Sequence, residues 1–353
     1  MKKQKRNLLA TLANKNYVNQ AKQLFSSVYF NAGWKGDYML LSHEIPEKDL
    51  GWFRKKGILV KKCKPFIKNN IGNYPALVLD KFYLFTSEFK KWKNIVYLDA
   101  DLIVRGSLDE LVKVKDFSAV KDIHESPISI NFKENEKKEL KELKKRHNIE
   151  KTGFNSGVFA FNSNTINRKL QNNVKKIIKK YCNIANGDQP LFNLVFYDKV
   201  NFLPPIFNVY IPNYSSVYLK IVKRKEPAII HLCSSDKPWN QSSPLYKEWK
   251  SNFDKAETIN LSHQLIEKKA IRKSEIHSFD DYLKTLKEEI IKNKTLAELY
   301  KKGDYKNYRK LLLKYIIKEG PLFWKREIFY YFASFFPKKA KEDIKKLLNQ
   351  TKQ

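Results

Sequence analysis

The stretch Ile95-Val-Tyr-Leu-Asp99-Ala-Asp101-Leu-Ile-Val104 sets two carboxylates at the end of a short apolar run. The length and the β-branched residues of 95–98 predict a buried strand, and 102–104 is expected to continue it after a break. Residues i and i+2 of a strand point the same way, so Asp99 and Asp101 are expected to lie on one side. In open α/β sheets, ligands bind outside the carboxyl ends of the strands, which is where this pair falls.

Candidate strands and helices alternate on both sides of this stretch. Short apolar runs predict strands, and a 3.6-residue periodicity predicts helices. Strands are expected at 7–13, 37–41, 57–60, 117–121, 154–161 and 228–231, and helices at 16–30, 46–55, 75–89, 132–146, 165–181 and 187–197. This alternation is typical of an α/β domain with a mainly parallel sheet flanked by helices.

Length and composition limit the class of protein. With 353 residues, 42% of them hydrophobic, the chain is long enough for one large or two smaller domains, which argues against a disordered or fibrous protein. After about residue 261 only two glycines and two prolines remain, and lysine alternates with apolar residues. We therefore expect an α/β domain at 1–260 and a basic, aromatic-rich α-helical extension at 261–353.

The charge of the chain is strongly positive. Lysine and arginine number 69 against 37 acidic residues, a formal net charge of +32. Such a charge attracts nucleic acid, anionic lipid or phosphorylated ligands, and drift in composition toward lysine also produces it. A nucleic-acid-binding protein is one alternative, but the chain shows no recognisable motif of that class and its charge is spread along the whole sequence. Nucleic acid is therefore not the expected partner.

Three features bear on the compartment. Cys63, Cys182 and Cys233 are far apart and suggest no disulfide framework, which favours a reducing compartment. The apolar run at 8–13 is too short for a signal peptide after its basic start. The uncharged run at 200–219 contains three prolines, which argues against a membrane span. We expect a cytoplasmic protein.

A second group of polar residues follows the strand expected at 228–231. It reads His231-Leu-Cys-Ser-Ser-Asp-Lys237-Pro-Trp239. Paired carboxylates such as Asp99 and Asp101 can hold a divalent cation that in turn holds a diphosphate, and an imidazole beside them suits manganese. Lys237 could neutralise a phosphate. The alternatives are two solvated loop carboxylates and a structural histidine.

A third group combines Phe154-Asn155-Ser-Gly157-Val with Gly187-Asp188-Gln189. Asn155 and Gln189 could donate to and accept from sugar hydroxyls, and Asp188 could accept from them. The competing interpretation of Asp188 is the N-cap of the helix that follows.

Together, and in this order from about residue 8 to residue 240, these motifs resemble glycosyltransferase family 8, the group with glycogenin and the bacterial lipopolysaccharide galactosyl- and glucosyltransferases. The resemblance implies a GT-A-type, Rossmann-like catalytic domain. It also implies metal-dependent, retaining transfer of a hexose from UDP-glucose or UDP-galactose to a glycan, a lipooligosaccharide or another acceptor. The cofactor would be Mn²⁺ or Mg²⁺.

The resemblance also implies roles for single residues. Asp99, Asp101 and His231 would be the metal ligands, the first two forming the family's Asp-x-Asp motif. The donor would be contacted by Thr11, Ala13, Asn14, Tyr17, Lys81, Ala100, Asn155 and Lys237. Tyr17 would stack on uracil, while Lys81 and Lys237 would reach the phosphates. Asp122, Asp188 and Gln189 would act on the transferred sugar, with Gln189 on its β-face. Lys15 departs from the family, because many relatives carry an acidic residue there.

The last third of the chain suggests a membrane surface. The segments 308–318 and 323–339 set basic residues beside dense aromatics. This composition suits helices that lie in an anionic membrane interface, and helices packed on the catalytic domain are the alternative. The first interpretation predicts a peripheral protein at the inner face of a membrane.

Two other functions compete with transfer. A catalytically inactive membrane-surface scaffold would have no use for Asp99, Asp101 and His231. A glycoside hydrolase needs two carboxylates on opposite sides of a sugar bond, and Asp99 and Asp101 are too close in sequence for that. A self-glycosylated tyrosine at 210, 214 or 218 is a further alternative to an acceptor-site loop.

Overall fold

The protein is described by a computed structural model that covers residues 6–122, 126–133, 137–210, 224–231, 237–263 and 270–319. The chain divides into two compact units, residues 1–281 and 282–353. The first unit extends past residue 260, and the end of the catalytic segment at that residue stays a prediction. No helix in the described part of the chain is both long and apolar enough to cross a bilayer.

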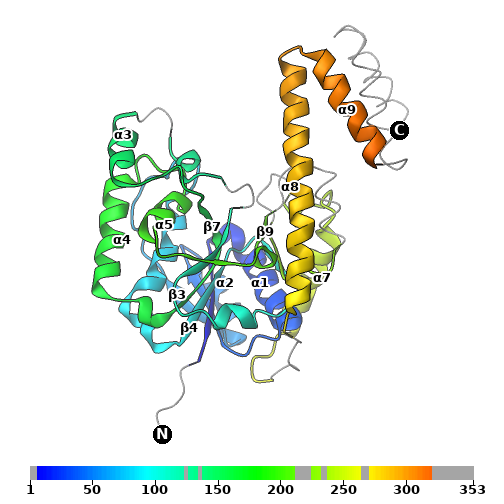
Figure 1. Cartoon of the computed structure of the whole chain (residues 1–353). Helices are drawn as coiled ribbons and strands as arrows, with labels where there is room; N and C mark the ends of the chain where they lie inside the picture. The colour runs from blue at the N-terminus through cyan, green and yellow to red at the C-terminus, as the bar shows by residue number, and fades with distance from the viewer. Residues whose placement is uncertain are drawn as a thin grey trace. The chain divides into compact units, whose positions relative to one another are not determined.

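The first unit is built on a seven-stranded sheet of order β3-β2-β1-β4-β7-β6-β8. Its strands are β1 Leu8–Ala13, β2 Asp37–Ser42, β3 Leu59–Lys62, β4 Asn94–Leu98, β6 Ser118–Lys121, β7 Phe154–Asn162 and β8 Asn201–Leu203. Within this sheet only β7 runs against its neighbours, β4 and β6. The prediction of a mainly parallel sheet flanked by helices is therefore confirmed (Figure 1).

A second sheet corrects one expectation. β5 (Leu102–Val104) does not continue β4, because the chain turns at Asp99–Asp101 and leaves the large sheet. β5 pairs antiparallel with β10 (Ile229–His231), which pairs in turn with β9 (Val209–Tyr210). Within that register His231 lies opposite Leu102. The turn therefore brings the histidine next to the second carboxylate.

Most expected helices are present, with bounds that differ by a few residues. They are α1 Val18–Ser27, α2 Glu47–Lys55, α3 Lys137–Arg146, α4 Arg168–Tyr181 and α5 Gln189–Val195. α8 Lys273–Lys301 and α9 Tyr305–Glu319 lie in the segment expected to be helical, whereas α7 Tyr246–Lys255 was not expected. The segment expected as one helix at 75–89 instead forms two 3₁₀ segments, Ala76–Phe85 and Ser87–Lys91. Thr86 between them is extended, and its hydroxyl donates to the carbonyl of Tyr83.

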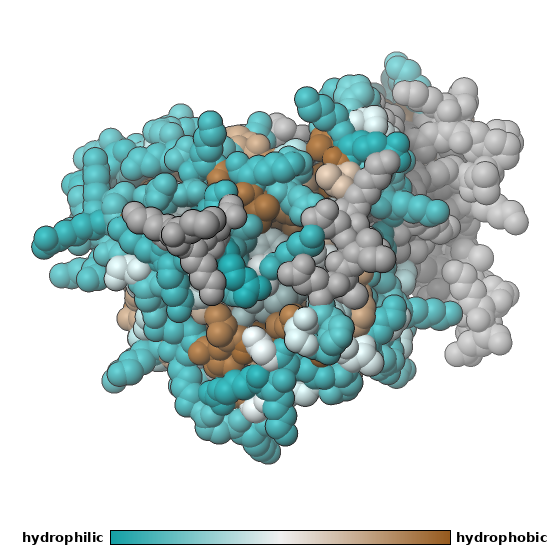
Figure 2. All heavy atoms as spheres, turned by 90° about the horizontal axis from the view of Figure 1, so that it is seen from below, coloured by the Kyte–Doolittle hydropathy of each residue, from teal (hydrophilic) through white to brown (hydrophobic). Residues whose placement is uncertain are grey.

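The core between the sheet and this 3₁₀ segment is aromatic. The ring of Phe85 lies 4.7 Å from that of Phe161 on β7 and 5.1 Å from that of Phe196. Phe117 and Phe196 stack with their centroids 3.6 Å apart. Such contacts bury large apolar areas and fix the strand ends beside them. Outside this core, the face shown in Figure 2 is mostly hydrophilic, with small brown apolar areas between teal residues.

We expect Phe85→Ala to lower the free energy of unfolding by about 3–5 kcal/mol, because the lost ring leaves a cavity among close-packed neighbours. Urea denaturation followed by tryptophan fluorescence measures this change. Phe202→Ala is the matched control, since 44% of Phe202 is exposed. Equal losses for the two variants would contradict the central place given to Phe85.

Candidate metal and nucleotide site

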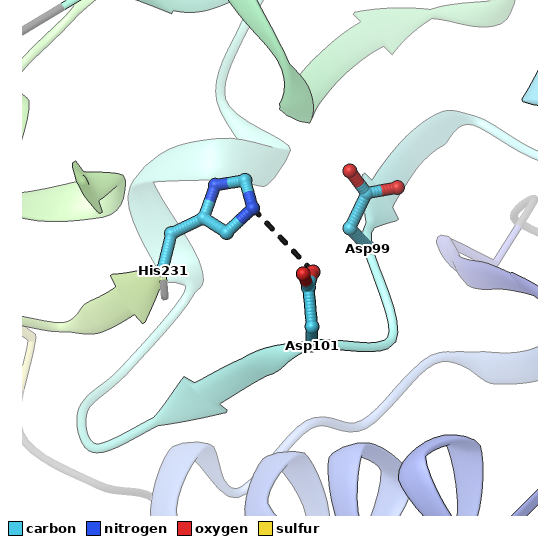
Figure 3. A group of neighbouring side chains, drawn as sticks. All are labelled: Asp99, Asp101 and His231. Carbon is cyan, nitrogen blue, oxygen red and sulfur yellow. Dashed lines mark ion pairs between the residues drawn. The ribbon is translucent and has the colours of Figure 1, made fainter. Parts of the chain in front are cut away.

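Three predicted metal ligands meet at the carboxyl end of β4. Asp99 follows the strand directly, Asp101 lies in the turn to β5, and His231 ends β10. One ligand atom from each lies within 4.8 Å of the other two (Figure 3). The structure therefore brings together residues that are more than a hundred positions apart in sequence.

The orientation of His231 is set by Asn208. Asn208 Nδ2 donates to Asn155 Oδ1 at 2.9 Å. The amide oxygen of Asn208 therefore points toward His231 Nδ1, at 3.0 Å. That oxygen accepts a hydrogen bond from the N–H at Nδ1, which directs Nε2 toward the carboxylates. Nε2 lies 3.4 Å from Asp101 Oδ1 and faces the carboxylates. Two carboxylates and such an imidazole form a donor set suited to manganese or magnesium.

Gly157 on β7 keeps the space beside the ligands open. Its carbonyl accepts from the backbone N–H of Asp99 at 2.8 Å. A Cβ at this position would lie 2.4 Å from His231 Cε1 and 2.9 Å from Asp99 Oδ2. Because His231 is 97% buried and its Nδ1 is bonded to Asn208, its ring has little room to move aside. Only glycine fits without displacing a ligand.

Lys81 carries a buried positive charge between two carboxylates. Its Nζ lies 2.9 Å from Asp99 Oδ1 and 2.9 Å from Asp188 Oδ2. Burial alone would lower the pKa of Lys81, but the charges of Asp188 and Asp99 outweigh it and raise that pKa. Burial raises the pKa of Asp188. The charge of Lys81 lowers that pKa, and the charge of Asp99 raises it further. Lys81 therefore stays protonated.

The alternative role of Asp188 is not seen. Asp188 stands at the N-cap position of α5, but its side chain makes no capping hydrogen bond. It pairs with Lys81 instead, because that buried cation needs a second counter-charge.

Lys237 pairs with the second carboxylate, Asp101. Its Nζ lies 2.6 Å from Asp101 Oδ2. Burial would raise the pKa of Asp101, but His231 and Lys237 together hold it below its usual range. The hydroxyl of the buried Tyr97 donates to Asp99 Oδ1 at 2.7 Å. Both carboxylates are thus held in place by neighbouring donors and cations.

The residues assigned to the transferred sugar form a connected network. Gln189 Oε1 accepts from Asn155 Nδ2 at 3.0 Å, and Gln189 Nε2 lies 3.3 Å from Asp122 Oδ2. Asp188 precedes Gln189 and joins this network to Lys81. The structure therefore brings Asp122, Asn155, Asp188 and Gln189 to one side of the metal ligands.

The residues assigned to the nucleotide lie around the end of β1. Thr11 and Ala13 are buried in the strand, and Asn14 Oδ1 accepts from the Asn16 N–H at 3.0 Å. The ring of Tyr17 meets that of Trp239 edge to face at 5.8 Å. Burial and the charge of Asp101 raise the pKa of Tyr17, while Lys237 opposes this rise and Asp99 adds to it. Ala100 is buried between the two aspartates.

Sequence reasoning missed three residues that shape the site. Asn208 orients His231 but lies in an uncharged, loop-like run with no signal of its role. The part played by Gly157 appears only when β7 is placed against Asp99. Tyr97 could have been found, because it stands two residues before Asp99 on the same strand face.

Some expected residues fall outside the described part of the chain. These are Cys233, Tyr214, Tyr218 and the aromatic segment 323–339. For Tyr210 only the backbone is described, in β9. Cys63 and Cys182 are free thiols.

The sequence model of glycosyl transferase family 8 matches residues 8–243, which contain every residue of this site. The chain belongs to this family. It is 29% identical over 228 residues to Glycosyltransferase GlyE of Streptococcus pneumoniae serotype 4, covering 58% of this chain and 50% of that protein. It is 27% identical over 173 residues to General stress protein A of Bacillus subtilis, covering 43% of this chain and 54% of that protein. The chain thus spans about half the length of these curated relatives.

Solved structures give the same fold. The galactosyltransferase LgtC, in complex with donor and acceptor sugar analogues, matches 70% of this chain and 95% of its own with a TM-score of 0.54 and 17% identity. The crystal structure of GlyE matches 74% of this chain and 63% of its own with a TM-score of 0.51 and 23% identity. At these identities the likeness shows the GT-A fold.

We expect Gly157→Ala to weaken manganese binding about tenfold or more, because the added methyl group displaces His231 or Asp99. A titration of the free ion by electron paramagnetic resonance measures the affinity. Gly51→Ala is the matched control, since a Cβ there meets nothing within 4 Å. If Gly157→Ala keeps its fold and its affinity for manganese, then Asp99, Asp101 and His231 do not form the metal site.

Proposed function

We propose that this family 8 member transfers a hexose, with retention, from UDP-glucose or UDP-galactose to a glycan or lipooligosaccharide acceptor in a metal-dependent reaction. The observation that carries the proposal is the convergence of Asp99, Asp101 and His231 between two cationic side chains. A hydrolase with two opposed carboxylates is not favoured, because Asp99 and Asp101 belong to one cluster.

Mn²⁺ or Mg²⁺ fits the donor set of Asp99, Asp101 and His231. When bound, such an ion acts as a Lewis acid toward the diphosphate of the donor. The chain contributes the fixed positions of the ligands, through Tyr97, Asn208 and the open space at Gly157.

The nucleotide would bind at the end of β1. Tyr17 is 37% exposed, and its ring would stack on uracil. Thr11, Ala13 and Asn14 would line the base from β1 and the turn after it, and the backbone of Ala100 would face the ribose. These positions meet the metal ligands from the side opposite the sugar network.

Lys81 and Lys237 would stabilise the leaving group. Cleavage of the bond between sugar and phosphate places developing negative charge on the β-phosphate of UDP. Both ammonium groups are held by carboxylates before the donor arrives, so little reorganisation is needed at the moment of reaction.

Gln189 would act on the β-face of the transferred sugar. Its amide is held by Asn155 and Asp122, which leaves the side chain little freedom. A carbonyl oxygen in that place would support an oxocarbenium-like state, and Asp122, Asn155 and Asp188 would bind the sugar hydroxyls. Retention then follows from attack on the same face that the leaving group departs from.

We expect Asp101→Ala to reduce manganese-dependent UDP release at least about 100-fold, because the ion loses a ligand and Lys237 loses its partner. The assay follows UDP release from a panel of UDP-sugars, with and without Mn²⁺, and Asp109→Ala, an exposed aspartate, is the matched control. Release from one sugar by the wild type names the donor. Turnover that survives in Asp101→Ala would overturn the metal assignment.

The same proposal places the protein in the cytoplasm, at the inner face of a membrane. Its support is the net charge of +32 and the basic, aromatic composition of the last third.

We expect the full chain to float with vesicles that contain phosphatidylglycerol and to stay at the bottom of the gradient with phosphatidylcholine alone, because lysines attract anionic headgroups. Flotation at low salt and again at 0.5 M NaCl separates attraction by charge from burial of aromatics. If the chain floats with the anionic vesicles at neither salt concentration, a membrane is not its partner.

A further inference from the structure

A cavity of about 840 Å³ lies away from the proposed catalytic site. It is bordered by Phe117 just before β6, by Thr165 just after β7, and by Asn201 at the start of β8. β6 and β8 run parallel to β4, and β7 runs against them. These three positions therefore lie at the edge of the sheet opposite Asp99. The cavity has the size of a small-molecule site and shares no residue with the catalytic one.

The walls of this cavity carry an excess of positive charge. Lys115, Lys169, Lys176 and Lys199 line it from three separate segments, against Asp116 and Asp198. Lys169 and Lys176 lie on one face of α4, because they are seven residues apart. None of the four lysines forms an ion pair within the described residues, whereas Asp198 is already paired with Lys151. The positive charge of these lysines favours an anionic ligand.

Amide side chains add hydrogen-bonding capacity. Asn164, Asn172 and Asn201 line the cavity, and within the described part of the chain their side-chain amides bond to no protein group. Each amide offers both donors and an acceptor, which is what the hydroxyls of a sugar need. Leu170 and Val200 are half-buried in the wall and offer apolar contact for the C–H groups of a sugar ring.

The lining disfavours nucleic acid and a single phosphate. The aromatic residues in the wall, Phe117 and Phe196, are each 99% buried and stack on each other, so no ring is free to receive a nucleic-acid base. The cavity is also far larger than a single phosphate requires. A sugar chain that carries carboxylates fits this lining. Its carboxylates would meet the lysines, its hydroxyls the amides, and its C–H groups the small apolar areas.

We propose that this cavity binds an acidic oligosaccharide, whose carboxylates pair with the lysines and whose hydroxyls bond to the asparagines. The site holds such a chain at the edge of the sheet remote from the bond-forming centre. Binding needs neither the donor nor the metal, so it stands or falls independently of the proposed transfer.

The test measures binding of trigalacturonic acid to the full chain by isothermal titration calorimetry. Maltotriose serves as the neutral trisaccharide, and inorganic phosphate as the small anion. We expect trigalacturonic acid to bind with at least about tenfold lower Kd than maltotriose, since the carboxylates add charge-assisted hydrogen bonds. Equal binding of the two trisaccharides, or no binding of trigalacturonic acid, would overturn the proposal. Displacement by phosphate at millimolar concentration would also overturn it, in favour of a small-anion site.

Matched variants on one helix localise the binding. Lys169→Gln with Lys176→Gln removes two charges from the cavity, and Lys175→Gln with Lys179→Gln removes two exposed charges elsewhere on α4. We expect the first pair to raise the Kd for trigalacturonic acid about tenfold or more and the second to change it less than about twofold. UDP release should be unchanged in both. Equal loss of binding in the two double variants would show attraction by net charge alone and refute the site.

Discussion

The pairing of β5 with β10 is the contact on which the site depends. The chain leaves the large sheet immediately after Asp99, and the antiparallel register then sets His231 opposite Leu102. A shift of one residue would turn every side chain of β10 to the other face, and the imidazole would leave the carboxylates. The second sheet has only short strands, yet it fixes the relation between the two halves of the site.

Charge is the second constraint. A cluster of carboxylates is costly to bury unless cations share the space. Lys81 pairs with Asp99 and Lys237 with Asp101. Lys81 is 96% buried and relies on Asp99 and Asp188 together. Such an arrangement contributes little to stability compared with an apolar core, but it leaves cations and carboxylates already in place for a charged substrate.

The sequence predicted the large sheet well, because β1, β4 and β7 are apolar runs of clear length. The sequence placed β5 in the large sheet, which is wrong, because three apolar residues do not indicate which strand they pair with. It missed the 3₁₀ form of Ala76–Phe85, whose apolar positions also fit an α-helix. The positions of Asp99, Asp101 and His231 followed from motifs at strand ends.

The other contacts could not be predicted, because they join distant segments. Asp188 satisfies the local rule for an N-cap, and only the position of the buried Lys81 shows why its side chain turns away. The support of His231 by Asn208 likewise depends on β9 lying beside β10.

If Asp99, Asp101 and His231 hold the catalytic metal, as proposed, Gly157 has a consequence for how such an enzyme would lose activity. Every single-codon missense change at a glycine introduces a Cβ, and here that one carbon meets both His231 and Asp99. A pseudoenzyme could therefore arise in one mutational step while keeping its Asp-x-Asp motif and its histidine. In a genome survey, the residue at this position would separate competent copies from inactive ones that a motif search counts as intact.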